Sequence, residues 1–420
     1  MPPGRGYPSR VTVLVLDRYR AVRARTLALA EPLSAEDQQV QSMPDVSPTK
    51  WHLAHTSWFF ETFVLGPHVP GYRVFDARFA FLFNSYYEAV GPRLPRGDRG
   101  LLSRPSLAEV LAYRRHVDEG MARYLESGAA SDDAGASCEL GLHHEQQHQE
   151  LLLTDIKHVL GSNPLRPAYG GAREERGVPH EAPSAPTLRT FEEGLAWIGH
   201  EGGHFAFDNE GPRHRRFQRA FALADRPVTC GDYLGFMRDR GYERPELWLS
   251  DGWLMCQRAG WRAPLYWERR DDEWATYTLA GMRPVYESEV VVHVSYYEAD
   301  AFARWAGMRL PTEDEWERAA QDTPAPGHLP NTGPPHPGAA RPGMFGDVWQ
   351  WTQSAYSPYP GYHPPAGPIG EYNGKFMSNQ MVLRGGSCFT PAGHVRATYR
   401  NFFAPGTRWQ VSGIRLARDV

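Results

Sequence analysis

The stretch that decides the fold of the first half is LHHEQQHQELLL, Leu142–Leu153, which carries His144 and His148 four residues apart. Four residues of α-helix advance by about 6 Å and turn by about 400°, so both imidazoles project from one face. A second stretch expected to be helical, Ser47–Leu65, carries two further histidines. Two histidines from one helix and one from another would make a facial three-histidine metal site in a bundle, which indicates an enzyme.

Four segments of the first half have the apolar periodicity and the end signals of helices, and we expect a four-helix bundle. They are Leu16–Ala30, Ser47–Leu65, Ser106–Leu125 and Ser137–Leu160. The second opens with Ser47-Pro48, which predicts a serine N-cap followed by proline at the first helical position. The connection over residues 66–105 is unusually long and contains FNSYYEAVGPRLPRG.

The chain has 420 residues, too many for one ordinary core, which predicts two domains. We expect a helical domain over residues 1–165 and a second domain over residues 191–420. Residues 166–190 are rich in Pro, Gly, Ala and charge, which is typical of a linker. In the second domain, short apolar runs separated by glycine and proline surround two expected helices, Tyr296–Trp305 and Thr312–Gln321.

Composition argues against several classes of protein. The net charge is −4 with no basic tail and no long run of like charge, so we expect no nucleic-acid partner. The four cysteines are widely spaced and form no CxxC pair, which excludes a disulfide framework and a zinc ribbon. No stretch approaches the roughly 18 apolar residues of a membrane span. We expect a cytoplasmic protein without a membrane partner, and its oligomeric state stays open.

Four phrases in the second half, VSYYEADAFARWAGMRLPTEDEWERAA, FGDVWQWT, VLRGGSC and GIRLAR, resemble the formylglycine-generating-enzyme/sulfatase-modifying domain. That resemblance implies an irregular, C-type-lectin-like α+β fold. In the first half, WHLAH and HHEQQHQE resemble the DinB-like metal-binding bundle. The two in this order resemble the EgtB-type sulfoxide synthases of ergothioneine biosynthesis. This implies a non-haem iron(II) oxidoreductase that uses O2 to join Nα-trimethylhistidine (hercynine) to cysteine or γ-glutamylcysteine, and leaves a sulfoxide.

The resemblance also implies which histidines hold the metal. His144 and His148 match the family's H-x3-H motif, and His55 matches the histidine that ends W-x-L-A-H. His143 points about 100° away from His144 on the helix, so it can hardly share a metal with His148. His52 lies three residues before His55, and the family motif alone decides between them. Three imidazoles do not select a metal, and the affinity order favours zinc, so Fe(II) is implied by the resemblance.

Tyrosines in the long connection are the expected catalytic residues. One branch of the family carries a tyrosine pair in this loop, and Tyr86 and Tyr87 match it. A phenol is a weak acid that could give a proton to a reacting oxygen species at neutral pH. Which of the two faces the iron stays open. Glu150, which follows the second ligand, is expected to be an outer partner or a structural residue.

Substrate contacts are implied in both halves. Gln147 matches a family residue near hercynine, and YRNFFAP matches the segment that contacts its trimethylammonium group. There Asn401 would be the polar contact and Phe402 an aromatic wall suited to a quaternary cation. Arg93 and Arg96 could hold the donor's carboxylate by bidentate hydrogen bonds.

Two departures narrow the chemistry. Phe403 stands where relatives that use γ-glutamylcysteine carry an acidic residue, so free cysteine is the preferred donor. Cys388 in RGGSC lacks the second thiol that formylglycine-generating enzymes use to bind copper, so we expect it to be buried and structural.

The alternative functions are the same reaction with γ-glutamylcysteine as donor, a sibling enzyme that uses unmethylated histidine or a selenosugar, a metal-dependent DinB-like thiol transferase, and a non-catalytic binding module.

Overall fold

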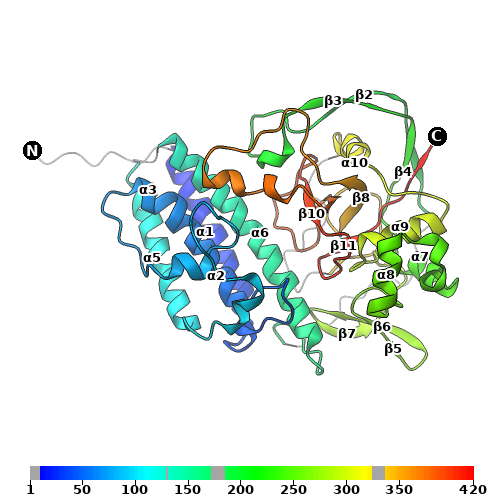
Figure 1. The fold of residues 1–420 in the computed structure, drawn as a ribbon, viewed down its shortest axis with the longest axis horizontal. Helices are drawn as coiled ribbons and strands as arrows, with labels where there is room; N and C mark the ends of the chain where they lie inside the picture. Colours follow the sequence, from blue (N-terminus) through cyan, green and yellow to red (C-terminus); the bar gives the residue numbers. More distant parts are fainter. Residues whose placement is uncertain (1–9, 129–130, 172–184, 324–335) are drawn as a thin grey trace, which may run out of the picture. The chain divides into compact units, whose positions relative to one another are not determined.

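The computed structural model describes residues 10–128, 131–171, 185–323 and 336–420. The chain divides into two compact units, residues 1–162 and 163–420 (Figure 1). The first unit is helical and the second combines short sheets with helices, so the expected α+β class is confirmed. Within the described residues, no helix has both the length and the apolar character that crossing a membrane requires.

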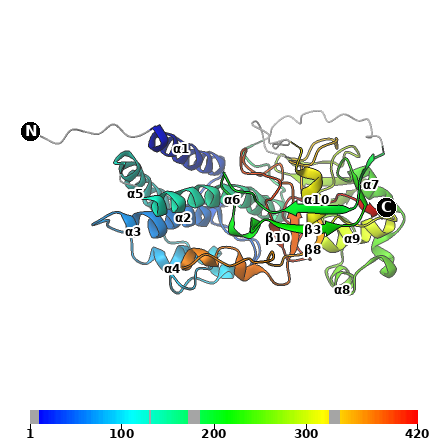
Figure 2. The same ribbon diagram turned by 90° about the horizontal axis from the view of Figure 1, so that it is seen from above.

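The first unit is the expected four-helix bundle (Figure 1, Figure 2). Its long helices are α1 Arg10–Ala30, α2 Thr49–Phe60, α5 Leu107–Glu126 and α6 Asp132–Ser162. Both α1 and α2 pack against α5 and α6, and every residue of α2 is buried. After α2 the chain continues through a π-helical turn, η2 Glu61–Leu65. The other short helical turns of the described residues are η1 Asp37–Gln39, α3 Gly66–His68, α4 Phe79–Phe83 and η3 Arg96–Leu101.

The predicted serine N-cap of α2 is wrong. The helix begins at Thr49, and Pro48 occupies the N-cap position without a side-chain cap. The Ser47 hydroxyl instead accepts a hydrogen bond from Arg99 at 2.8 Å, and the Ser47 backbone N–H donates to Asp155 at 2.8 Å. The chain just before this buried helix is therefore fixed by residues from η3 and α6.

A buried ion network fixes α6 against α1 and α5. The Glu145 carboxylate is fully buried and accepts hydrogen bonds from Arg23 at 2.8 Å, Thr26 at 2.6 Å and Arg114 at 2.5 Å. Burial by itself would raise the pKa of Glu145, but Arg114 and Arg23 hold it at about 2. Because the network surrounds the residue next to His144, it sets the rotation of α6 in the bundle.

In the part of the second unit that the structure describes, the strands form four small sheets. One has the order β1-β4-β12 and is formed by Leu188–Phe191, Phe221–Ala224 and Ala417–Asp419. Another has the order β10-β9-β8-β11 and is formed by Asn401–Phe403, Met381–Arg384, Trp349–Ala355 and Ser412–Gly413. The two smaller sheets pair β2 Gly194–Ile198 with β3 His214–Gln218, and β5 Trp267–Arg270, β6 Glu273–Thr278 and β7 Gly281–Pro284.

The described residues of the second unit form four α-helices: α7 Cys230–Arg238, α8 Ser250–Ala259, α9 Tyr296–Trp305 and α10 Glu313–Ala320. The sequence predicted α9 at its observed bounds and α10 to within one residue at each end. It missed α7 and α8, which are short and contain glycines that lower helix propensity. Cys388 is buried, as expected.

The segment predicted as a linker, residues 166–190, has structure at both ends. At its start, the Pro167 carbonyl accepts a hydrogen bond from Tyr277 at 2.7 Å, and the Tyr169 backbone N–H donates to Leu279 at 2.8 Å. Residues 172–184 lie outside the described residues. At its end, β1 begins at Leu188 and pairs with β4.

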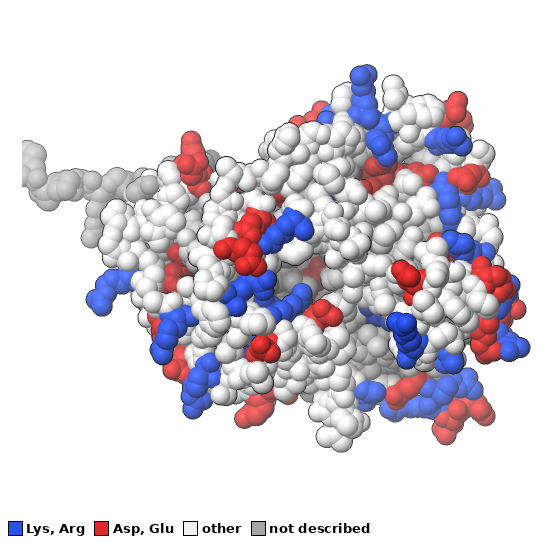
Figure 3. Space-filling model, in the orientation of Figure 1, with Lys and Arg blue, Asp and Glu red and all other residues white. Residues whose placement is uncertain are grey.

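Charged side chains of both signs are interspersed on the face drawn in Figure 3. The arrangement is in keeping with the net charge of −4, which reflects 45 basic and 49 acidic residues.

Candidate metal centre

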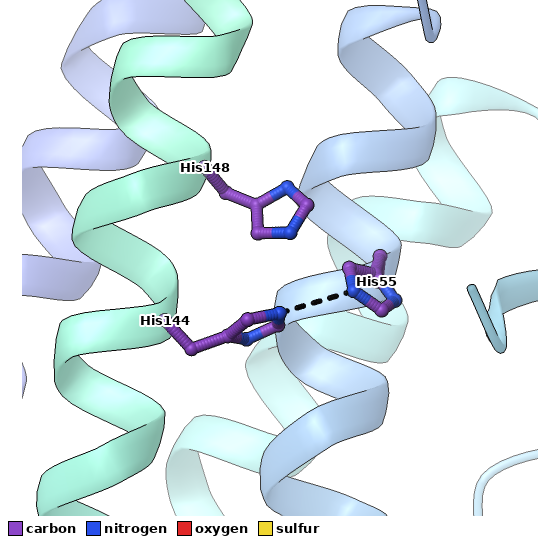
Figure 4. Close-up of side chains that lie close together, drawn as sticks. All are labelled: His55, His144 and His148. Atoms are coloured by element: carbon purple, nitrogen blue, oxygen red, sulfur yellow. Dashed lines mark hydrogen bonds between the residues drawn. The ribbon is translucent and has the colours of Figure 1, made fainter. Parts of the chain in front are cut away.

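Three histidines converge in the interior of the bundle: His55 from α2, and His144 and His148 from α6 (Figure 4). Each offers one ring nitrogen, and these nitrogens lie within 4.8 Å of one another. The Nε2 atoms of His55 and His144 are 3.2 Å apart. All three side chains are buried, and in the part of the chain that the structure describes they form the one such group. The structure thus brings together the three histidines that the sequence predicted as ligands.

The histidine group is uncharged at neutral pH. Burial lowers the pKa of His144 to about 3, although the neighbouring Glu145 carboxylate opposes this shift. Burial also holds the pKa of His55 and of His148 well below the usual 6.5, and repulsion from His144 adds to both shifts. A histidine must be neutral to bind a metal, so protons do not compete for these nitrogens at physiological pH.

The donor set fits a divalent transition-metal ion. The Nδ1 of His55 lies 2.6 Å from the Phe83 carbonyl, which accepts its hydrogen and leaves the Nε2 lone pair for a ligand bond. Three neutral imidazoles on one side suit iron, zinc or copper and would leave the remaining positions to other ligands. The donor set permits iron and does not choose it.

The other histidines of the two helices have separate partners. His143 lies 2.8 Å from an Arg18 guanidinium nitrogen. The Nε2 of His52 lies 3.0 Å from the Asp155 carboxylate, and its Nδ1 lies 2.8 Å from the Nδ1 of His148. His52 therefore contacts a member of the group without belonging to it. Glu150 also stands outside the group.

The tyrosine pair lies one aromatic ring from the histidines. The rings of Tyr86 and Tyr87 stack with centroids 4.6 Å apart. Tyr87 is fully buried, and its ring lies 5.6 Å from that of Trp58, which stacks on His55 at 5.5 Å. Phe59 lies 6.5 Å from Tyr87 and 4.6 Å from His144. Aromatic contacts therefore join the loop of the pair to two of the three histidines.

Hydrogen bonds hold this loop in place. The Asn84 amide accepts from the Tyr87 backbone N–H at 3.1 Å and donates to the Tyr87 carbonyl at 3.0 Å. The residue before it, Phe83, is the one whose carbonyl accepts from His55. The residue after it, Ser85, accepts from Arg99 at 3.1 Å. The loop that carries the tyrosines is thus tied directly to a predicted metal ligand.

Arginines follow the tyrosines at regular spacing. Arg93 forms an ion pair with Glu88 at 2.8 Å, and Arg96 donates to the Asp45 carbonyl. Arg99, which sequence reasoning missed, is 3% exposed, and its guanidinium carbon lies 3.4 Å from the centroid of the Trp51 ring. The signal that could have found it is the continuation of R-x2-R to R-x2-R-x2-R.

Arg99 is a buried cation without a carboxylate partner among the described residues. Its hydrogen bonds go to the hydroxyls of Ser47 and Ser85. Burial lowers its pKa well below the usual 12.5, repulsion from Arg96 adds to the shift, and the charge of Asp155 opposes it. The Trp51 ring beneath it also stacks on His55, with centroids 4.5 Å apart. A buried and unpaired guanidinium beside a predicted ligand is a natural place for an anion.

The residues predicted to contact hercynine belong to both units: Gln147 to the first, and Asn401 and Phe402 to the second. Gln147 is half-buried on α6, next to His148. Asn401 opens the edge strand β10, and its side-chain oxygen accepts from the Phe402 backbone N–H at 2.9 Å. The Phe402 ring stacks on Tyr356 at 4.1 Å, and Phe376 lies nearly parallel at 5.9 Å. One face of Phe402 is therefore already occupied by another ring.

Comparison with known proteins identifies both halves of the chain. Residues 18–152 match the DinB superfamily, and residues 178–331 and 341–420 match the Sulfatase-modifying factor enzyme 1-like domain. The hercynine oxygenase of Mycolicibacterium smegmatis is 31% identical over 449 aligned positions, which cover 96% of this chain and 98% of that protein. The hercynine oxygenase of Mycobacterium tuberculosis is 32% identical, with 95% and 97% covered. The formylglycine-generating enzyme of Streptomyces coelicolor is 31% identical but matches 52% of this chain and 84% of that protein.

Proposed function

Because the chain belongs to the hercynine oxygenase family, with a DinB-like bundle followed by a sulfatase-modifying-factor-like domain, we propose that it is an iron(II)-dependent sulfoxide synthase. The reaction joins the imidazole carbon of hercynine to the sulfur of free cysteine, with O2 as oxidant and a sulfoxide as product. The observation that carries this proposal is the buried group of His55, His144 and His148 in the bundle.

The three histidines would hold the iron, and their facial arrangement would leave open positions for substrates. When bound there, iron supplies the binding of thiolate and O2 and the electron transfer that oxidative C–S bond formation needs. The protein's part is to keep the three imidazoles neutral and to exclude water. Burial accomplishes both, since it lowers the pKa of each ring and surrounds the group with Trp51, Trp58 and Phe59.

Tyr86 and Tyr87 are our proposed proton donors. Their rings stack, and Tyr87 packs on Trp58, which stacks on His55. The phenol Oη of one of them gives a proton to the reacting oxygen, and the Asn84 hydrogen bonds keep the pair in place during that step.

We add Arg99 to Arg93 and Arg96 as a proposed binding residue for the carboxylate of the sulfur-donating substrate. A free amino acid presents a carboxylate that a planar guanidinium binds by two parallel hydrogen bonds. Arg99 has the burial that makes such a pair strong, and it lies next to the ring that stacks on His55. Phe403, which packs against Trp409 at 5.8 Å, offers no charge for the amino group of a γ-glutamyl donor, and this supports free cysteine.

Hercynine is proposed to contact Gln147, Asn401 and Phe402. Its trimethylammonium group suits an aromatic surface, and the Phe402 ring belongs to a stack with Tyr356 and Phe376. Because Tyr356 covers one face of Phe402, the cation would meet the edge of this stack or its remaining face.

The test is anaerobic reconstitution with iron(II), followed by cysteine, hercynine and O2, with products identified by mass spectrometry. A hercynine–cysteine sulfoxide that requires both iron and O2 establishes the reaction and the donor together. γ-Glutamylcysteine and unmethylated histidine are run in parallel as alternative substrates. Turnover of a thiol with zinc and without O2 would replace the proposal by a thiol transferase, and cysteine sulfinate as the sole product would replace it by a thiol dioxygenase.

A further inference from the structure

Three polar side chains, Asp155, His52 and His148, form a hydrogen-bonded series that leads from the C-terminal half of α6 to the predicted metal group. We propose that Asp155 and His52 are positioning residues that fix which nitrogen of His148 carries hydrogen, and so leave its Nε2 free for the metal. The inference rests on the proposed function, because it assigns a role relative to the same histidine group. It adds two residues of this chain to that site.

Both contacts between these side chains are within hydrogen-bond distance. One oxygen of Asp155, Oδ2, lies 3.0 Å from the Nε2 of His52 and 2.8 Å from the backbone nitrogen of Ser47. The Nδ1 of His52 lies 2.8 Å from the Nδ1 of His148. Asp155 and His52 are each 2% exposed, so water does not compete for these bonds. Asp155 follows His148 by seven residues, about two helical turns, which puts both on one face of α6.

The directions of the hydrogen bonds follow from what each group can do. An ionised carboxylate accepts only, so the Nε2 of His52 must carry hydrogen and donate to Asp155. We take His52 as neutral: its ring then carries a single hydrogen, on Nε2, and its Nδ1 is an acceptor. The Nδ1 of His148 must therefore carry hydrogen and donate to His52. This leaves the Nε2 of His148 with a lone pair and no hydrogen.

The same arrangement occurs at His55 by a different route. There the Phe83 carbonyl accepts from Nδ1 and leaves Nε2 as the ligand atom. Two of the three predicted ligands are thus oriented in the same sense, one by the backbone and one by two side chains. A backbone carbonyl cannot be removed by substitution, whereas the side chains of Asp155 and His52 can. The proposed positioning role is therefore tested at these two residues. Outer partners of this kind typically change metal affinity by about 10- to 100-fold.

The competing explanation is that Asp155 and His52 only join α2 to α6. His52→Phe keeps a ring of similar shape but removes both hydrogen-bonding nitrogens, whereas His52→Gln keeps one acceptor for His148 and one donor for Asp155. His143→Phe is the matched control, because His143 lies one residue from His144 and contacts Arg18 instead. If the role is positioning, His52→Phe weakens binding of Co(II) and Fe(II) by about 10- to 100-fold, and His52→Gln restores most of it.

Two measurements make the outcome decisive. In metal-free protein labelled with 15N-histidine, NMR should find hydrogen on Nδ1 of His148 in the wild type and a shift toward Nε2 in His52→Phe. Titration with Co(II), followed by its visible spectrum, gives the affinity and the coordination geometry. Hydrogen on Nε2 of His148 in the wild type, or equal affinities in wild type and His52→Phe, would overturn the inference. Failure of the wild type to bind either ion, with the expected hydrogen position found, would instead contradict the proposed metal site.

Discussion

The substitution Arg99→Met tests whether Arg99 serves to bind the cysteine substrate or to stabilise the fold. In the free protein the guanidinium is buried, makes hydrogen bonds to two serine hydroxyls and has no carboxylate partner among the described residues. Methionine fills a similar volume and carries no charge. If the positive charge is there to bind an anionic substrate, removing it should harm that binding and leave the fold intact.

The magnitudes follow from the contacts. Losing two hydrogen bonds to hydroxyls costs about 1 kcal/mol each, while removing an uncompensated buried charge recovers a comparable or larger amount. We therefore expect the melting temperature of Arg99→Met to equal or exceed that of the wild type. Truncating one partner of a buried charge pair costs about 3 kcal/mol, which corresponds to about a 100-fold rise in KM for cysteine. The kcat should change much less, because the carboxylate is bound equally in ground state and transition state.

The assay combines steady-state kinetics at varied cysteine with thermal unfolding monitored by circular dichroism. Arg99→Lys is the control, since it keeps the charge but loses the planar pair of donors, and its KM should fall between those of wild type and Arg99→Met. The reasoning is refuted if Arg99→Met melts several degrees lower and shows the wild-type KM for cysteine. That result would make Arg99 a structural link between Ser47 and Ser85.

Three other expectations concern the same unit. Tyr86→Phe or Tyr87→Phe should lower C–S bond formation and divert O2 toward cysteine sulfinate, and normal sulfoxide yield from both single variants and the double variant would disprove the role. His144→Ala should reduce iron content after reconstitution to background, while His143→Ala should retain it, as measured by elemental analysis. Because the folded pKa of Glu145 is about 2 against an ordinary 4.5, its contribution to stability is complete above about pH 4.5 and is lost as the pH falls toward 2. Urea unfolding of metal-free protein should lose on the order of 3 kcal/mol over that window, and Glu145→Gln should lack this loss.

Spacing along the chain was enough to predict the bundle and the histidine pair on α6, because both depend on helical period alone. It could not choose between His52 and His55, since residues three apart share a helix face. The structure separates them by their partners: His55 turns toward His144, and His52 contacts Asp155. That distinction depends on a residue of another helix, and no local pattern contains it.

Burial of charge was the second feature that the sequence could not provide. Nearly all of the 45 basic residues are arginines, and those of the long connection look alike in sequence. In the structure Arg93 pairs with Glu88, whereas Arg99 is enclosed over Trp51. The difference arises from how η3 packs on the start of α2, which is a tertiary property. Phe402 gives the same lesson, because its motif suggested an open aromatic wall while Tyr356 covers one of its faces.

The charge balance of the first unit favours an anionic donor. Three neutral imidazoles would bring no negative charge to a divalent ion, so such a site keeps two positive charges. Arg99 adds a third, and it is close enough to the group to contribute to the lowered pKa of both His55 and His148. The buried Asp155 carboxylate, which acts on Arg99, offsets part of this charge, and an anionic substrate would offset more of it. Cysteine offers a thiolate for the metal and a carboxylate for the guanidinium, and because its amino group is protonated it would bring one net negative charge to the site.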